Sequence, residues 1–270
     1  MPVAGADVGT ECVKSIVLDD GGKILGRAAV STRGYFQDCF QEAMGNALAE
    51  AQVAAADLRG VYLTGFGASC APVPAQTVTE TLCHARAAHR HLGKAMTVVD
   101  IGGRDPKLVH VDAAGTVTSS RSVRKCAVGI GTFLMFASRH LDVHPTRLMD
   151  LASTAEKPAR VGSYCSVFAE VEVIELLRTG ATAGEIALGC MYSVADRILE
   201  MDRLTGPVVV TGGVCEYFPG VVKALAERSR LPVEILPEPI MAGALGAALY
   251  ALDAARAGAP AGAAAEAAAS

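Results

Sequence analysis

The sequence predicts an α/β fold with two similar lobes, and three observations support this. Residues 5–25, GADVGTECVKSIVLDDGGKIL, resemble residues 98–118, VVDIGGRDPKLVHVDAAGTVT, when Asp7 is aligned with Asp100. Around these two copies, apolar runs with strand character alternate with segments of helical periodicity. The chain has 270 residues, 51% hydrophobic and 19% charged, so it is able to bury a sizeable core.

Each copy of the repeat reads as an apolar strand, an Asp-x-Gly turn, a second strand that begins near a lysine, and a turn into a third strand. The alignment places Gly9 on Gly102 and Lys14 on Lys107. Glycines in such a turn let backbone N–H groups approach an anion. One such turn is also an ordinary hairpin. Two copies in one register favour a clamp for the β- and γ-phosphates of a nucleotide, with the aspartates holding Mg²⁺ through water.

The rest of the chain is expected to alternate helices and strands. Helices are predicted at 36–54, 78–92, 131–141, 166–178, 183–203, near 217–228 and from about 240, and strands at 60–66, 206–213 and 231–236. This order predicts a first lobe at residues 1–95, with the helix at 240–254 packing back on it, and a second lobe at 96–239. The low-complexity tail at 255–270 is expected to fray.

Two later segments contain small residues suited to a close approach. TGGV follows an apolar strand and precedes a helix, so Gly212 and Gly213 are expected to bring backbone near a ligand. In the terminal helix, Gly243 and Ala244 place small residues on one face. That face suits either the adenosine of a nucleotide or a neighbouring helix.

Composition narrows the class of protein. The formal net charge of -4, without a basic stripe, argues against a nucleic-acid partner. The N-terminus has neither a basic nor an apolar leader region, and no apolar run approaches the roughly 18 residues of a membrane helix. We therefore expect a cytoplasmic protein without a membrane partner.

Eight cysteines are many for such a chain. They form no CxxC pair, which argues against a zinc ribbon, and without a secretory signal a disulfide framework is not expected. Six of them are interpreted as small buried residues. The other two, Cys126 and Cys165, each stand just before a helical run, where a cysteine is either inert or a stabilised thiolate.

Several segments resemble known motifs. DVGT, DIGGRD, TGGV and GALGAAL are similar to motifs of the acetate and sugar kinase, Hsc70 and actin superfamily, whose two ribonuclease H-like lobes enclose a nucleotide cleft. KCAVGIGTFL (125–134) and YCSVFAEVEVIELL (164–177) resemble one branch of it. That branch contains the ATP-dependent activators of 2-hydroxyacyl-CoA dehydratases and the ATPase subunits of benzoyl-CoA reductases. The resemblance runs from about residue 4 to residue 252.

The resemblance implies a [4Fe–4S] cluster on the two-fold axis between two ATPase subunits, identical or homologous. Cys126 and Cys165 match the two cysteines that each subunit supplies. The chemistry agrees, because such a cluster needs four thiolates and this chain offers two in suitable settings. The resemblance further implies reduced ferredoxin or flavodoxin as the donor. It implies a CoA-thioester reductase or dehydratase as the acceptor of low-potential electrons.

The nucleotide site is predicted from the matching positions. Asp7 and Asp100 are expected to hold Mg²⁺ or its water shell, and Asp105 to orient the attacking water. Lys14 either reaches the phosphates or is a solvated strand lysine. Arg104 replaces a glutamine common in the family, and either acts on transition-state charge or marks a slower ATPase. The remaining expected cofactor-binding residues are Gly9, Thr10, Gly102, Gly103, Gly129, Gly131, Gly212, Gly213, Gly243 and Ala244.

Other departures from the family pattern guide the choice of function. GTECVK (9–14) is closer to benzoyl-CoA reductase ATPase subunits than to the GSTxxK of homodimeric activators, and Thr132 stands where arginine is usual. Of Glu170 and Glu172, at most one is expected to face the site. The sequence thus favours an ATPase component of an ATP-dependent benzoyl-CoA reductase. The alternatives are a dehydratase activator, a small-molecule kinase and a non-catalytic nucleotide sensor.

Overall fold

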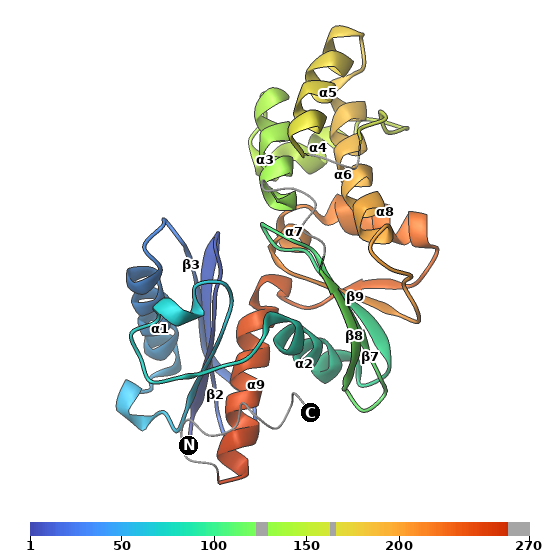
Figure 1. Cartoon of the computed structure of the whole chain (residues 1–270). Helices are drawn as coiled ribbons and strands as arrows, with labels where there is room; N and C mark the ends of the chain where they lie inside the picture. The colour runs from blue at the N-terminus through green and yellow to red at the C-terminus, as the bar shows by residue number, and fades with distance from the viewer. Residues whose placement is uncertain (123–128, 163–165, 259–270) are drawn as a thin grey trace. The chain divides into compact units, whose positions relative to one another are not determined.

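In the computed structural model the chain forms two units, and the structure describes residues 1–122, 129–162 and 166–258 (Figure 1). Unit 1 comprises Met1–Leu92 and Met241–Ser270, and unit 2 comprises Gly93–Ile240. Each unit contains one mixed five-stranded sheet with its own helices. The predicted α/β architecture with two similar lobes is therefore confirmed.

The sheet of unit 1 is built around the first copy of the repeat. Its strands are β1 (Val3–Val8), β2 (Cys12–Leu18), β3 (Ile24–Ser31), β4 (Val61–Thr64) and β5 (Gln76–Thr77). They lie in the order β3-β2-β1-β4-β5, with β2 antiparallel to its neighbours and β4 parallel to β1. The predicted three-stranded meander is present, and β1 lies at the centre of the sheet.

Helices cover both faces of this sheet. They are α1 (Phe36–Ala51), α2 (Glu80–Leu92) and α9 (Ala242–Arg256). Apolar residues of α1 pack against the face of β1 that carries Ala4, Ala6 and Val8. On the opposite face α9 lies against β1 so closely that a Cβ atom on Gly5 would be 2.1 Å from the Ala248 nitrogen. This close packing of α9 on β1 requires small residues where the two elements cross.

The sheet of unit 2 repeats the same arrangement. Its strands are β6 (Met96–Asp100), β7 (Lys107–Val111), β8 (Val117–Ser122), β9 (Val208–Thr211) and β10 (Val233–Ile235). The order β10-β9-β6-β7-β8 matches that of unit 1 read from the other edge, again with antiparallel pairs in the meander and parallel pairs beyond it. The internal repeat of the sequence is thus a repeat of topology.

One face of the second sheet shares a hydrophobic core with the α-helices of unit 2. These are α3 (Ile130–His140), α4 (Leu148–Ala152), α5 (Ser166–Arg178), α6 (Ala183–Leu199), α7 (Gly213–Tyr217) and α8 (Pro219–Ser229). The start of α6 follows from its sequence, because Thr182 and Glu185 form a reciprocal capping box. Buried Leu, Ile, Val and Met side chains of β6, β7 and β9 and of these helices form one core.

Some expectations about single elements were wrong in detail. The helix predicted near 217–228 is α8, and the short helix α7 that precedes it was not predicted. The short helix α4 was not predicted. Of the six cysteines expected to be buried, Cys70 is exposed and Cys12 is half-buried. Across the residues that the structure describes, no helix is long and apolar enough to cross a membrane.

Candidate functional site

In each sheet a buried aspartate in the last two residues of the first strand is paired with a lysine of the next strand. Asp7 lies opposite Lys14 in the β1–β2 register, and Asp100 lies opposite Lys107 in the β6–β7 register. Lys14 Nζ donates to Asp7 Oδ2 at 2.7 Å, and Lys107 Nζ donates to Asp100 Oδ2 at 3.3 Å. The aspartates are 5% and 3% exposed. Such burial is tolerated because each carboxylate has a cationic partner.

The parallel neighbour of each first strand adds a Thr-Gly step in the same register. Asp7 lies opposite Thr64, and Asp100 lies opposite Thr211. The glycines that follow, Gly65 and Gly212, have φ of 93° and 95°. A Cβ atom on Gly65 would lie 2.4 Å from Asp7 Oδ1.

Gly212 has the same relation to Asp100, because its Cβ atom would lie 2.6 Å from Asp100 Oδ1. Both positions therefore need glycine for conformation and for space. Sequence reasoning selected Gly212 and missed Thr64 and Gly65. The dipeptide Thr-Gly follows an apolar strand in both TGF and TGG, and this repeat could have identified Thr64 and Gly65.

The predicted phosphate turn of unit 1 is tightly closed. Gly9 N donates to the Cys12 carbonyl at 3.2 Å, and Thr32 Oγ1 donates to the Gly9 carbonyl at 2.8 Å. A Cβ atom on Gly9 would lie 2.8 Å from that same Cys12 oxygen, so this position requires glycine. Thr10 is half-buried at the tip of the turn. Lys14 also donates to the Cys12 carbonyl, at 3.2 Å, which places its ammonium beside the turn.

The corresponding turn of unit 2 contacts the beginning of α3. Ile130 N donates to the Arg104 carbonyl at 3.1 Å, and Gly131 N donates to the Gly103 carbonyl at 3.2 Å. A Cβ atom on Gly129, whose φ is 82°, would lie 2.4 Å from the Gly103 oxygen. The glycines of the GIG segment therefore let the first turn of α3 lie directly on the predicted phosphate loop.

The other predicted residues of this loop are also located. Gly102 has open space around a built Cβ atom. Arg104 and Asp105 are half-buried and both have interaction partners. Cys126 lies outside the described residues.

The residues predicted to line an adenosine pocket have different surroundings. Gly243, in the first turn of α9, lies against the Asp7 side chain, and Ala244 is fully buried. Close packing within unit 1 therefore accounts for this small face. Gly212 N donates to the Pro239 carbonyl at 2.8 Å, and the half-buried Gly213 begins α7. Lining of an adenosine pocket by these residues stays a prediction.

Of Glu170 and Glu172 in α5, the structure describes the side chain of Glu172. Glu172 Oε2 accepts a hydrogen bond from Gly162 N at 2.6 Å, so Glu172 holds the chain at the end of the described segment before α5. The side chain of Glu170 lies outside the described residues, as does Cys165. The roles of Cys126 and Cys165 therefore stay predictions.

A buried thiol lies near each Asp–Lys pair. Burial raises the pKa of Cys83 to about 12, and its sulfur lies beside Thr64. Cys215 Sγ donates to the Thr211 carbonyl at 3.2 Å, and burial raises the pKa of this thiol well above its usual range. Both groups are protonated at neutral pH and act as small apolar residues with a weak donor.

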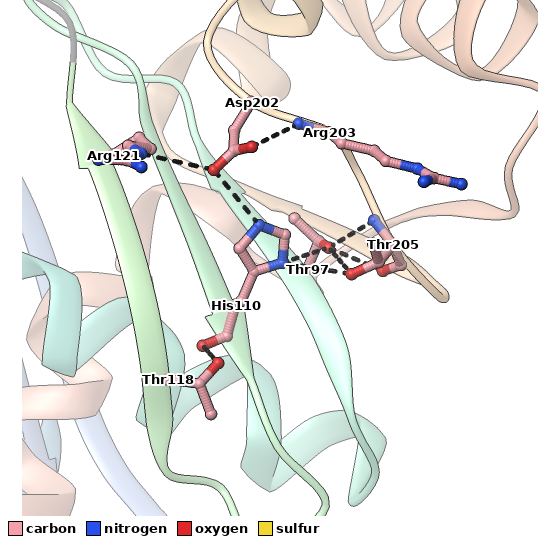
Figure 2. A network of polar contacts seen from close by, with 7 residues as sticks. All are labelled: Thr97, His110, Thr118, Arg121, Asp202, Arg203 and Thr205. Atoms are coloured by element: carbon pink, nitrogen blue, oxygen red, sulfur yellow. Dashed lines mark hydrogen bonds and ion pairs between the residues drawn. The ribbon is translucent and has the colours of Figure 1, made fainter.

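Unit 2 contains a further polar network that sequence reasoning missed (Figure 2). Thr97 Oγ1 donates to the Thr205 carbonyl at 2.7 Å, and His110 Nδ1 lies 3.3 Å from both threonine hydroxyls. Asp202 lies 3.5 Å from Arg121 Nε and 3.9 Å from His110 Nε2. The network joins β6, β7 and β8 to the loop before β9, and we interpret it as structural.

The two Asp–Lys pairs have the chemistry of a phosphate and magnesium site. A carboxylate suits Mg²⁺ or its water shell, a lysine suits phosphate, and a glycine turn offers backbone N–H groups. Asp7 Oδ1 is buried without a hydrogen-bond partner among the described residues, so its capacity to accept a ligand is unfilled. Each site lies where the first strand ends, the edge of an α/β sheet at which ligands bind. The residues present therefore fit a magnesium nucleotide.

Comparison with known proteins identifies the family. The sequence profile of the BadF/BadG/BcrA/BcrD ATPase family matches residues 4–251. The chain belongs to this ATPase family. The resemblance seen in the motifs is thus confirmed over nearly the whole chain.

Members of this family that are similar to the chain include dehydratase activators. The activator of lactoyl-CoA dehydratase from Anaerotignum propionicum is 34% identical over 95% of this chain and 99% of its own. The crystal structure of component A of (R)-2-hydroxyglutaryl-CoA dehydratase from Acidaminococcus fermentans has a TM-score of 0.87 at 33% identity, covering 95% of this chain and 99% of that one. The activator of 2-hydroxyisocaproyl-CoA dehydratase from Clostridium difficile, solved with bound ADPNP, has a TM-score of 0.86 at 30% identity, covering 96% and 97%.

A reductase component of the same family is also similar. One of the subunits of benzoyl-CoA reductase from Thauera aromatica is 32% identical over 92% of each chain. The chain is thus an ATPase from a family that serves both dehydratases and reductases of CoA thioesters. The comparisons support the alternative, a dehydratase activator, better than the reductase that GTECVK and Thr132 favoured. Whole-chain similarity favours the dehydratase activators.

Proposed function

We propose that this chain is the ATP-hydrolysing activator of a 2-hydroxyacyl-CoA dehydratase. The observation that carries the proposal is the near-complete agreement in fold and length with dehydratase activators, at a TM-score of 0.87 over 95% of the chain. The structure of a relative with bound ADPNP supports ATP as the nucleotide. The paired Asp–Lys turns supply residues suited to Mg²⁺ and phosphate.

In this proposal the two turns divide the work of holding magnesium ATP. Asp7 and Asp100 orient the hydrated Mg²⁺, and Lys14 offers its ammonium to the phosphates. Backbone groups at Gly9, Thr10, Gly102 and Gly103 approach the phosphate oxygens. Asp105 orients the attacking water, and Arg104 takes the position from which charge developing on the γ-phosphate is stabilised. Lining of the adenosine pocket is assigned to Gly212 and Gly213.

Cys126 and Cys165 are proposed as this chain's half of the ligands of a [4Fe–4S] cluster shared with a second ATPase subunit. Bound there, the cluster would supply one-electron transfer. This chain contributes a short connection between the phosphate loop and the proposed cluster site. The loop Gly103–Arg104 is hydrogen-bonded to the first turn of α3, and α3 begins four residues after Cys126. In this proposal a change at the phosphate loop is passed through these hydrogen bonds to the first turn of α3.

The partners follow from the same family. The proposed acceptor is a CoA-thioester dehydratase, and the proposed donor is reduced ferredoxin or flavodoxin. A benzoyl-CoA reductase is the second candidate, favoured by the 32% identity to a component of that enzyme and by GTECVK.

Anaerobic purification separates these proposals from a kinase of the same fold. We expect about four irons per dimer and magnesium-dependent ATP hydrolysis. Cys126→Ser and Cys165→Ser should lose the iron and keep ATP binding, while Cys70→Ser, at an exposed cysteine, should keep both. Iron-free protein that transfers phosphate to a small molecule would contradict the proposal. Activation of a dehydratase, and not of a benzoyl-CoA reductase, by the same preparation decides between the two acceptors.

A further inference from the structure

The surroundings of Asp7 assign different tasks to its two carboxylate oxygens. Oδ2 accepts the hydrogen bond from Lys14 Nζ at 2.7 Å. Oδ1 is buried and has no partner among the described residues. An unpaired buried oxygen of this kind is costly, and binding of a ligand at that oxygen recovers the cost. The orientation of the Asp7 carboxylate therefore decides whether Oδ1 is presented to a ligand.

Gly243 is the residue of α9 that faces this carboxylate. The three heavy atoms nearest to a Cβ atom built on Gly243 all belong to the Asp7 side chain: Oδ2 at 2.9 Å, Cγ at 3.0 Å and Cβ at 3.1 Å. At Gly246, one turn further along the helix, the Cβ atom would instead lie 2.0 Å from the Cys83 backbone oxygen. A methyl group at 243 thus meets a side chain that is able to rotate. At 246 it meets rigid backbone.

We propose that Gly243 is a positioning residue for Asp7. Its missing side chain leaves the space in which the carboxylate lies with Oδ2 on Lys14 and Oδ1 toward the ligand. This inference rests on the proposed role of Asp7 in holding Mg²⁺. It gives Gly243 a task within unit 1 that differs from lining an adenosine pocket.

The first test is Gly243→Ala in the full-length protein. Displacement of the carboxylate should lower kcat/KM for magnesium ATP by about 10- to 100-fold, since a misplacement of about 1 Å in a site costs roughly 100-fold. Excess Mg²⁺ should recover part of the rate, and ATP binding in the presence of EDTA should be unchanged. Gly45→Ala is the matched control, because Gly45 is an exposed glycine of α1 with nothing within 4 Å of its built Cβ atom. A Gly243→Ala protein with wild-type dependence on Mg²⁺ would overturn the inference.

A double-mutant cycle keeps the inference testable even if Gly243→Ala folds poorly. Asp7→Gly removes all three close contacts, so adding Gly243→Ala to Asp7→Gly should raise Tm, as an alanine does in an unobstructed helix. In the wild-type background the same substitution should lower Tm or leave it unchanged. Gly246→Ala should lower Tm equally in both backgrounds. If Gly243→Ala lowers Tm by the same amount with and without the Asp7 side chain, Gly243 acts through other contacts and the inference fails.

Failure of the proposed function and failure of the positioning role give different results. If the wild-type protein shows no magnesium-dependent hydrolysis, the proposed function fails, while the cycle in Tm still measures the contact between Gly243 and Asp7. If the wild type hydrolyses ATP and Gly243→Ala matches it, the function stands and the positioning role is wrong.

Discussion

The hairpin turns of the two units differ in how firmly each holds its aspartate. In unit 1 the Asp7–Lys14 pair is 2.7 Å long and the lysine side chain is 11% exposed; in unit 2 the Asp100–Lys107 pair is 3.3 Å long and the lysine is 19% exposed. A Cβ atom on Gly9 would collide with its own turn, whereas one on Gly102 would have free space. The same pattern of residues has therefore produced one closed turn and one looser turn.

The neighbours of the turns explain this difference. The first aspartate lies under α9, with Gly243 against its side chain. The second turn is joined through Gly103 and Arg104 to the first turn of α3. The strand register is the same in both units because it depends on the strands alone. The packing around each turn depends on helices, and these differ between the units. The first turn is therefore packed against α9, and the second is hydrogen-bonded to α3.

Removal of each lysine gives the largest contrast between the turns. Lys14→Met leaves a buried carboxylate without its cation and should cost about 3–5 kcal/mol in the free energy of unfolding. Lys107→Met should cost less, about 3 kcal/mol, because its ion pair is longer and its lysine is more exposed, while Asp100 is as buried as Asp7. Urea denaturation at neutral pH measures both. Equal costs would show that the two turns hold their aspartates equally firmly.

The repeat was predictable because Asp-x-Gly and the following lysine keep a constant spacing in both copies. The Thr-Gly steps were not aligned because the inserted chain differs. One long helix, α1, separates β3 from β4, whereas α3, α4, α5 and α6 separate β8 from β9. Contacts between distant segments, such as Gly243 with Asp7 and Gly131 with Gly103, depend on folded geometry that no local pattern encodes. The prediction that Cys126 and Cys165 bind a cluster rests on the resemblance to the family.

The Thr-Gly steps should respond alike, in contrast to the lysines. Gly65→Ala and Gly212→Ala each place a side chain at positive φ and against an aspartate oxygen and a backbone carbonyl. Each should cost about 1–3 kcal/mol in the free energy of unfolding. Gly102→Ala is the control, since its Cβ atom meets nothing within 4 Å. A cost for Gly65→Ala near zero would mean that unit 1 adjusts more easily than its tight turn suggests.

Alkaline pH tests the buried thiols of the two units. Burial raises the pKa of Cys83 and of Cys190 from an ordinary 9.0 to about 12. Their contribution to stability is therefore complete below pH 9 and is lost as pH rises from 9 toward 12, because only the unfolded chain ionises. At about pH 10 each thiol should cost about 1.4 kcal/mol.

Substitution of either thiol should remove its share of this alkaline loss. We expect Cys83→Ala in unit 1 and Cys190→Ala in unit 2 each to reduce the difference in free energy of unfolding between about pH 8 and about pH 10 by about 1.4 kcal/mol. Urea denaturation under reducing conditions measures it. The exposed Cys70 serves as control, and Cys70→Ala should leave the difference unchanged. An unchanged difference in Cys83→Ala alone would show that the site in unit 1 admits water.

The smallest expected effect concerns the outer strand of each meander. In unit 1, β3 packs against α1, and several of its side chains are buried or half-buried. In unit 2, nearly all of β8 is exposed, and Arg121 on this strand interacts with Asp202 (Figure 2). Arg121 is 65% exposed, so Arg121→Ala should change the free energy of unfolding by less than about 1 kcal/mol. Its local effect should be faster hydrogen exchange at the amides that pair β7 with β8. If exchange accelerates equally in β2 and β3, the strand is not held by this contact, and the difference between the two hairpins has another origin.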